Sequence, residues 1–291
     1  MAPSVFDSLA AELLAPQGLL HPGQPPQRSA LEILAQMAAA EGCTPQIATQ
    51  VMVHGFKWWK QPPASKLFVQ LLFHIFSKDK VERRLGETPR VAEDCIRFLL
   101  TAFAADNAAA GGPEPVDVLR TMGTMLFENG AACQKLHSTL LATLLPLTSP
   151  AVSIDADIRR MAINCLGNVC VGTGTKSPQL QKDAFAALLS NLDGDISDEG
   201  VSKVLSSAFR GLQLLINENK SLAVDSVAVL VNHLQRCALT HPDSSAKRGP
   251  ASPARDTRPS PRKGTLFTSD SELSEGELKG SKFRYISPSG R

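Results

Sequence analysis

Three glycines, Gly123, Gly167 and Gly211, recur at intervals of 44 residues. Each lies inside a segment whose apolar residues have the spacing of a helix, and apolar residues or a cysteine follow it at the third and fourth positions. A glycine in a helix interior costs about 1 kcal/mol relative to alanine. Three such glycines in register therefore predict neighbouring helices that pack closely. A period of roughly 40–47 residues is typical of solenoids built from helix pairs.

The composition favours helices and supplies enough apolar residues for a core. Hydrophobic residues make up 43% of the sequence and charged residues 20%, which excludes disorder along the whole chain. Aromatic residues, which strands favour, amount to only 5%. The formal net charge of +2 argues against nucleic-acid binding by the body of the protein.

The six cysteines are scattered and show neither a disulfide framework nor the spacing of metal ligands. The N-terminal segment carries Asp7 and Glu12 and lacks the basic start of a secretory signal. No apolar run reaches the roughly 18 residues that a membrane span needs. These features predict a protein of the cytoplasm or the nucleus that does not enter a membrane.

Apolar periodicity predicts helices along most of residues 1–240 and no strand. Thr44 and Pro45 form a helix start, whereas Pro62 and Pro63 are expected to end the helix that begins at Pro45. Neighbouring helices are expected to pair as long hairpins. The predicted helices cover residues 4–15, 29–40, 45–59, 64–77, 91–105, 116–128, 131–146, 157–171, 179–192, 201–217 and 224–239.

The predicted fold is all-α: a HEAT/armadillo-type right-handed α-solenoid over residues 1–240, followed by a disordered tail over residues 241–291. The tail is rich in Ser and Pro and is first basic, then acidic. Ser252 and Ser260 precede prolines, and Ser269 and Ser274 each have a glutamate three residues later. These four serines are candidate phosphorylation sites. A segment of this composition also contains such pairs by chance, and the two interpretations carry similar weight.

Residues 157–169, which contain Asp157, Arg159 and Gly167, resemble the second helix of a HEAT repeat. That resemblance implies that Asp157 lies in the turn and that Arg159 opens the helix near the turn acids Asp155 or Asp157 or near an acidic turn of the next repeat. It also implies that Gly167 packs on the next repeat. We therefore expect Gly123, Gly167, Gly211, Arg159 and Asp157 to serve repeat packing.

A more specific resemblance covers most of the predicted solenoid. Residues 129–136, 158–170 and 208–215 resemble, in order and spacing, the N-terminal region of the HEAT repeat-containing protein 6 family, and residues 269–277 look like the acidic linker of that family. The resemblance implies an ARM-type fold, a domain of unknown function and no catalytic residues. Members of that family carry further repeats after the linker, so we expect this chain to be an incomplete solenoid.

Three patterns that suggest chemistry fit turns and helix faces better. Residues 172–177 lack the glycine that precedes the lysine of a phosphate loop, and residues 193–204 lack the glycine and glutamate of a calcium loop. Cys133 and His137 lie four residues apart without a third orienting group. We therefore predict no catalytic residue, no cofactor and no metal site.

Residues 54–60, His-Gly-Phe-Lys-Trp-Trp-Lys, interleave aromatic and basic side chains. They could stack on a nucleic acid. The favoured interpretation is that Phe56 and Trp59 share a helix face with Met52 and close the core. The predicted function is a non-catalytic scaffold or adaptor that binds protein partners of unknown identity. The alternative is a nucleic-acid-associated protein that uses the basic tail and residues 54–60.

The last predicted helix, residues 224–239, is apolar on more than one side and carries only Asp225 as a charge up to Leu234. The terminal repeat of a solenoid needs a polar outer face, because nothing packs on it. We therefore expect an uncapped C-terminal repeat, through which residues 226–234 self-associate or bind a partner.

Overall fold

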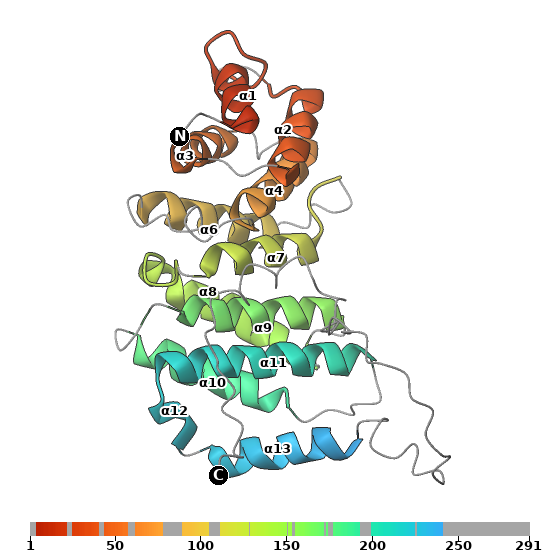
Figure 1. The fold of residues 1–291 in the computed structure, drawn as a ribbon, viewed down its shortest axis with the longest axis vertical. Coiled ribbons are helices and arrows are strands. Elements are labelled where there is room, and N and C mark those ends of the chain that lie inside the picture. Colours follow the sequence, from red (N-terminus) through yellow and green to blue (C-terminus); the bar gives the residue numbers. More distant parts are fainter. Residues whose placement is uncertain are drawn as a thin grey trace, which may run out of the picture. The chain divides into compact units, whose positions relative to one another are not determined.

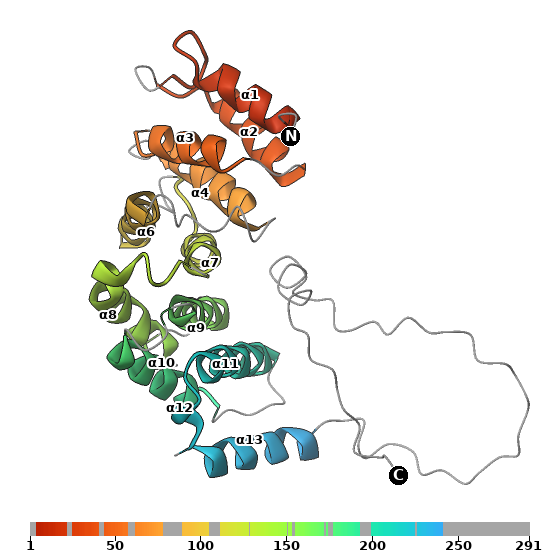
Figure 2. The same ribbon diagram turned by 60° about the vertical axis from the view of Figure 1, so that its left-hand side comes forward.

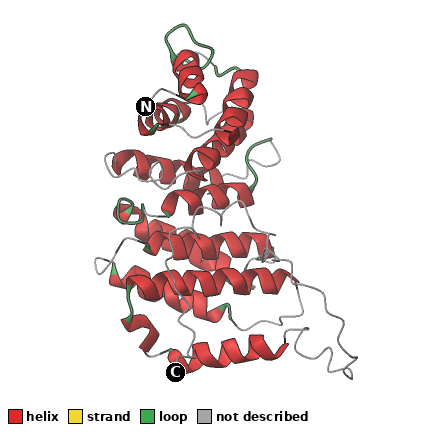
Figure 3. Cartoon of the chain, in the orientation of Figure 1, coloured by secondary structure: helices red, strands yellow, loops and turns green. Residues whose placement is uncertain are grey.

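The computed structural model describes residues 4–21, 25–40, 44–57, 62–77, 89–104, 111–127, 129–149, 151–152, 155–171, 173, 177–192, 199–224 and 226–240. Within these ranges the regular elements are all helices, so the all-α prediction is confirmed there (Figure 3). The α-helices are α1 (Val5–Leu14), α2 (Arg28–Ala40), α3 (Pro45–Gly55), α4 (Pro62–Ser77), α6 (Pro89–Ala104), α7 (Pro115–Leu126), α8 (His137–Thr148), α9 (Ala156–Cys170), α10 (Pro178–Ser190), α11 (Glu199–Glu218), α12 (Ser221–Val224) and α13 (Val227–Thr240). A 3₁₀ helix, η2 (Gln134–Leu136), precedes α8.

The chain divides into two compact units, Met1–Val227 and Ala228–Arg291. The first unit holds α1 to α12, and α13 begins at the boundary and belongs to the second. Residues 241–291 lie outside the described residues. The predicted tail, with its candidate phosphorylation sites Ser252, Ser260, Ser269 and Ser274, therefore stays a prediction.

Within the first unit the helices form two rows, which Figures 1 and 2 show from two sides. In one row α2, α4, α7, α9 and α11 each pack on the next. In the other, α1, α3 and α6 pack in succession and α8 packs on α10. Each helix of the second row also packs on the helix that follows it in the chain, as α8 packs on α9 and α10 on α11. Neighbouring helices thus pair as the sequence predicted.

Local sequence signals start the first helices of this unit. Ser4 and Asp7 form a capping box at α1, in which the Ser4 hydroxyl accepts a hydrogen bond from the Asp7 N–H at 3.0 Å. Thr44 caps α3 by accepting from the Ile47 N–H, and Pro45 occupies the first turn. The buried Asp7 carboxylate also accepts from the Thr44 N–H at 2.9 Å. One carboxylate therefore joins the starts of two helices in the second row.

The core of the first unit is mainly aliphatic, with one aromatic cluster where α3, α4 and α6 meet. Phe68 is fully buried, and its ring centroid lies 5.1 Å from that of Phe98. Phe56 meets the Phe68 ring edge-on at 6.0 Å. Gly55 permits this contact, because a Cβ at Gly55 would overlap the Phe68 ring. The cluster fixes the end of α3 against α4.

Three predicted helix boundaries were wrong. Pro62 does not end the preceding helix: α3 already ends at Gly55, and Pro62 begins α4. The helix expected over 131–146 starts only at His137, because residues 129–136 form turns and η2. Two contacts hold these turns: the Asn129 side chain donates to the Met125 carbonyl at 2.9 Å, and Gly130 lies against the backbone of Val169. The helix expected over 224–239 is divided between α12 and α13.

None of the helices in the described part of the chain is both long enough and apolar enough to cross a membrane.

Candidate interaction surface

Two side chains of α9 donate hydrogen bonds to backbone carbonyls of α7. The Asn168 Nδ2 donates to the Gly123 carbonyl at 2.8 Å, and the Cys165 thiol donates to the Leu119 carbonyl at 3.2 Å. Gly123 leaves room for this approach, since a Cβ there would lie 3.3 Å from Cys165 Sγ. Residues 119 and 123 thus face residues 165 and 168 in the same order, which shows that α7 and α9 run parallel.

The contact between α9 and α11 brings together two of the three glycines that recur every 44 residues. A Cβ added to Gly167 would lie 2.9 Å from the Gly211 Cα and 3.8 Å from a methyl carbon of Leu214. A Cβ on Gly211 would instead meet Leu188 of α10, at 3.0 Å. The glycines have equal spacing in the sequence but face different neighbours, because each helix has its own rotation about its axis.

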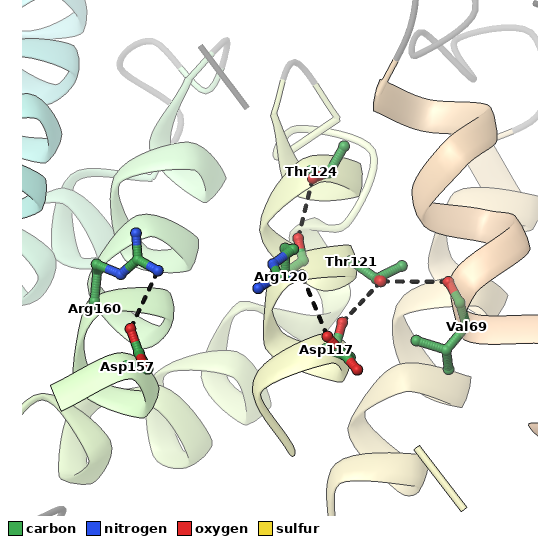
Figure 4. Close-up of polar contacts among 7 residues, drawn as sticks. All are labelled: Val69, Asp117, Arg120, Thr121, Thr124, Asp157 and Arg160. Atoms are coloured by element: carbon green, nitrogen blue, oxygen red, sulfur yellow. Dashed lines mark hydrogen bonds and ion pairs between the residues drawn. The ribbon is translucent and has the colours of Figure 1, made fainter. Parts of the chain in front are cut away.

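Two acid–arginine pairs lie on α7 and α9, as Figure 4 shows. The Asp117 carboxylate pairs with Arg120 at 3.3 Å, and the Asp157 carboxylate pairs with Arg160 at 3.2 Å. The Arg120 guanidinium also lies 6.0 Å from the ring centroid of Phe73 on α4. The Asp117–Arg120 pair is partly exposed and contributes little to stability, whereas in the other pair Arg160 is mostly buried and Asp157 is exposed. The two pairs give two adjacent helices of one row a polar surface.

The structure pairs Asp157 with Arg160, a residue that the sequence analysis did not single out. A spacing of three residues on one helix face could have suggested this partner. Arg159 is half-buried and takes part in interactions of its own. The predicted contact of Arg159 with a turn acid stays a prediction. Asp155 accepts from the Asp157 and Ile158 backbone N–H groups as the N-cap of α9.

A continuous polar stripe follows α11 at intervals of three and four residues, which is one face of a helix. We call these residues the α11 stripe. Arg210 is half-buried and the other members are exposed. Glu199, the first residue of α11, precedes the stripe by four residues. Its members are Lys203, Ser206, Arg210, Gln213 and Asn217.

Hydrogen bonds join Ser177 and Thr173 to the helices around them. The His137 Nε2 lies 2.8 Å from the Gly130 carbonyl, and its Nδ1 lies 3.4 Å from the Ser177 hydroxyl. The Gln181 side-chain amide donates to the Thr173 hydroxyl at 3.2 Å, and the Asn219 side-chain amide donates to the Gln181 side-chain carbonyl at 3.1 Å. Each of these hydrogen bonds holds a connecting segment or a helix end in place, so we assign them a structural role.

Four cysteines, Cys95, Cys133, Cys165 and Cys170, are buried. Burial, with a smaller effect of the Glu93 charge, raises the pKa of Cys133 to about 12. Burial, with Glu218, raises the pKa of Cys170 to about 12, and burial raises the pKa of Cys165 well above its usual range. The ring nitrogens of His137 bond to Gly130 and Ser177. A thiol that keeps its proton at neutral pH lacks the thiolate that a nucleophile needs.

The segment 54–60 is only partly described. Phe56 packs on Phe68 and Phe98, as the core interpretation expects, and Lys57 is exposed. Burial, followed by the charges of Lys57 and His21, lowers the pKa of His54. Residues 58–60, including Trp59, lie outside the described residues. Because Phe56 contributes to the core, it does not offer a free ring for stacking.

Within the described ranges, no group of three or more His, Cys, Asp or Glu side chains is arranged to hold a metal ion.

Comparison with known proteins yields partial similarities. No family model matches the chain, and no solved structure matches it. A protein of Dictyostelium discoideum that is described as uncharacterized is 31% identical over 126 residues. The match covers 41% of this chain and 8% of that protein. The chain thus spans a small part of the length of the curated relative that it matches.

Proposed function

We propose that the chain is a non-catalytic scaffold or adaptor that binds other proteins through a HEAT/armadillo-type solenoid in the cytoplasm or the nucleus. The carrying observation is the two-row packing, in which α2, α4, α7, α9 and α11 follow one another in one row. Helices stacked in this way present a long surface to which each helix contributes a few side chains. The resemblance of three segments to the HEAT repeat-containing protein 6 family supports the proposal.

The chemistry of the described residues supports binding rather than catalysis. Several polar side chains in the interior form caps, turns and helix contacts, as the Asp7 and Asn168 hydrogen bonds illustrate. In the acid–arginine pairs of α7 and α9, the Arg120 side chain is 35% exposed and the Asp157 side chain is 55% exposed, whereas the Arg160 side chain is 13% exposed. Arginine is enriched in protein interfaces because it combines charge, hydrogen bonding and stacking.

The test is quantitative affinity capture from cells with the full chain and two double variants. Arg120→Glu with Asp157→Arg reverses the charge of one exposed member of each pair on α7 and α9. Arg28→Glu with Arg97→Glu is the matched control, since both arginines are exposed and both pair with a glutamate four residues away. We expect the first variant to lose a specific partner by about tenfold, which is the effect of one strong interface contact.

The control variant should retain that partner, and both variants should melt like the wild type. Equal loss of the partner from both double variants would reduce the effect to non-specific electrostatics. The absence of any protein enriched over a mock capture would contradict the scaffold proposal itself.

We further propose that the chain self-associates or binds a partner through α13. Val227, Val231 and Leu234 are 53%, 45% and 54% exposed, and their spacing places them on one helix face. Light scattering at rising concentration should report a mass above that of the monomer, and Val231→Asp should restore the monomer. A monomer at high concentration, without dye binding to apolar surface, would contradict this proposal.

A further inference from the structure

Thr44 is a hydroxyl residue that directly precedes a proline and is accessible in the folded chain. Its side chain is exposed. Its backbone, at φ −72° and ψ 150°, has the extended conformation that a residue before proline favours, and Pro45 follows it in the first turn of α3. A hydroxyl residue followed by proline is the sequence that proline-directed protein kinases recognise. Thr44 therefore combines the sequence and the exposure of a substrate of such a kinase.

The hydroxyl of Thr44 also takes part in the contact between α1 and α3. It donates to Asp7 Oδ1 at 3.2 Å, and the Thr44 N–H donates to the same oxygen at 2.9 Å. Asp7 lies on α1, which packs on α3, and is only 5% exposed. One of the two hydrogen bonds that join Asp7 to the start of α3 thus depends on the proton of an exposed hydroxyl.

Ser177 provides a comparison within the same chain. It precedes Pro178 at the start of α10, as Thr44 precedes Pro45 at the start of α3. In contrast to Thr44, Ser177 is half-buried, and its hydroxyl lies 3.4 Å from the Nδ1 of His137. A kinase reaches a half-buried hydroxyl only after local opening of the fold. The two sites therefore share the dipeptide and differ in access.

We propose that Thr44 is a phosphorylation site of a proline-directed protein kinase, and that its modification releases α1 from α3. The kinase transfers the γ-phosphoryl group of ATP to Thr44 Oγ1. A P–O bond forms at Oγ1, the bond from the γ-phosphorus to the bridging oxygen breaks to give ADP, and the hydroxyl proton passes to a base of the kinase. This modification does not depend on the scaffold function.

The charge of the phosphate explains the release. A phosphothreonine carries a charge of about −1.5 to −2 at pH 7. Phosphorylation removes the proton that Thr44 donates to Asp7 and places this charge beside a carboxylate. Because Asp7 is buried, water screens the repulsion only weakly. The N–H groups at the start of α3 favour a phosphate, so α3 itself should persist while its contact with α1 weakens.

The first test is phosphorylation of the full chain by a purified proline-directed kinase with ATP and Mg²⁺, followed by quantitative mass spectrometry of the phosphopeptides. We expect the initial rate at Thr44 to be at least about tenfold that at Ser177, because only Ser177 requires local opening. Absence of phosphate on Thr44, or equal rates at the two residues, would overturn the assignment of the site.

The second test is hydrogen exchange of the full chain before and after the kinase reaction. Amides of α1 should exchange at least about fivefold faster after phosphorylation, whereas those of α9 should not change. Thr44→Ala treated in the same way is the control, since it keeps every other Ser-Pro site. Unchanged exchange of α1 in the modified protein, or the same acceleration in Thr44→Ala, would overturn the proposed release.

Two further variants test the role of charge. In Asp7→Asn the side chain keeps an oxygen that can accept from the Thr44 N–H but has no charge, so phosphorylation should accelerate exchange of α1 by less than about twofold. Because Asp7→Asn can itself loosen α1, Thr44→Glu and Thr44→Gln serve as a second pair of similar size. Thr44→Glu should exchange α1 faster than Thr44→Gln, and equal exchange in this pair would overturn the repulsion mechanism.

Discussion

The α7–α9 contact and the α9–α11 contact join neighbouring helices of one row by different means. Between α7 and α9, Asn168 and Cys165 donate to backbone carbonyls, and Gly123 gives them room. Between α9 and α11, Gly167 lies directly against the backbone of Gly211. The first contact depends on specific donors, whereas the second depends on the absence of side chains.

This difference shows that equal sequence spacing does not imply equal contacts. A glycine that faces a backbone atom cannot gain a side chain unless one of the helices moves. A glycine that faces a flexible side chain can gain a side chain of its own, because the neighbouring side chain rotates away. The α9–α11 contact should therefore be the more sensitive to volume, and the α7–α9 contact the more sensitive to loss of a hydrogen bond.

The largest expected effect is that of Gly167→Leu. The added side chain would overlap the Gly211 backbone and force α9 and α11 apart, which should cost about 3 kcal/mol of unfolding free energy. Urea denaturation followed by circular dichroism measures the change. Gly211→Leu should cost less but still at least about 1 kcal/mol, because Leu188 can adjust. Unchanged stability of both variants would show that the glycines do not set the helix packing.

Asn168→Ala should remove the hydrogen bond to the Gly123 carbonyl and cost about 1.5 kcal/mol. The Gly123 carbonyl keeps its bond from the Phe127 N–H, so the loss stays moderate. Asn164→Ala is the control, since Asn164 lies half-buried one turn earlier on the same helix. If both variants lose equal stability in the same denaturation assay, helix propensity rather than the cross-helix bond would explain the effect.

A pair of alanine variants sharpens the comparison further. Alanine gains about 1 kcal/mol over glycine in helix propensity. At Gly211 this gain should roughly offset the mild crowding of Leu188, so the melting temperature should change little. At Gly167 the crowded atom belongs to the backbone, and Gly167→Ala should melt at a lower temperature than the wild type. If Gly211→Ala melted at a lower temperature than Gly167→Ala, the assigned glycine environments would be wrong.

The buried thiols should contribute no pH dependence to the unfolding free energy near neutrality and should lower it in alkali. Burial raises the pKa of Cys133 and of Cys170 from 9.0 to about 12. Between these values the unfolded chain has lost thiol protons that the folded chain keeps, so stability falls as pH rises. Urea midpoints should be flat from about pH 7 to pH 8.5 and fall above about pH 9.

Other groups also titrate in alkali, so the double variant Cys133→Ala with Cys170→Ala is the control for the thiols. Its urea midpoint should fall less steeply above pH 9 than that of the wild type. Identical slopes would show that these two thiols do not cause the alkaline loss.

Much of the fold could be predicted from local sequence signals. The helix starts at Pro45 and Ala156 follow from Thr44 and Asp155 as N-caps, which act within one turn of chain. The turns and η2 over residues 131–136 were harder, because nothing local forbids a helix there. Gly130, just before them, lies against the Val169 backbone, which is distant in the sequence. The α11 stripe could have been found in the sequence, because its polar residues recur at intervals of three and four positions.

The approximate helices, their order and the positions of the close-packing glycines follow from periodicity, caps and side-chain volume, which can be read along the chain. The contacts of Gly167 with Gly211, of Gly211 with Leu188 and of Asn168 with the Gly123 carbonyl cannot be read in this way. The physical reason is that the rotation of a helix about its axis is set by all of its neighbours at once. Packing on two rows fixes that rotation, and no local pattern contains it.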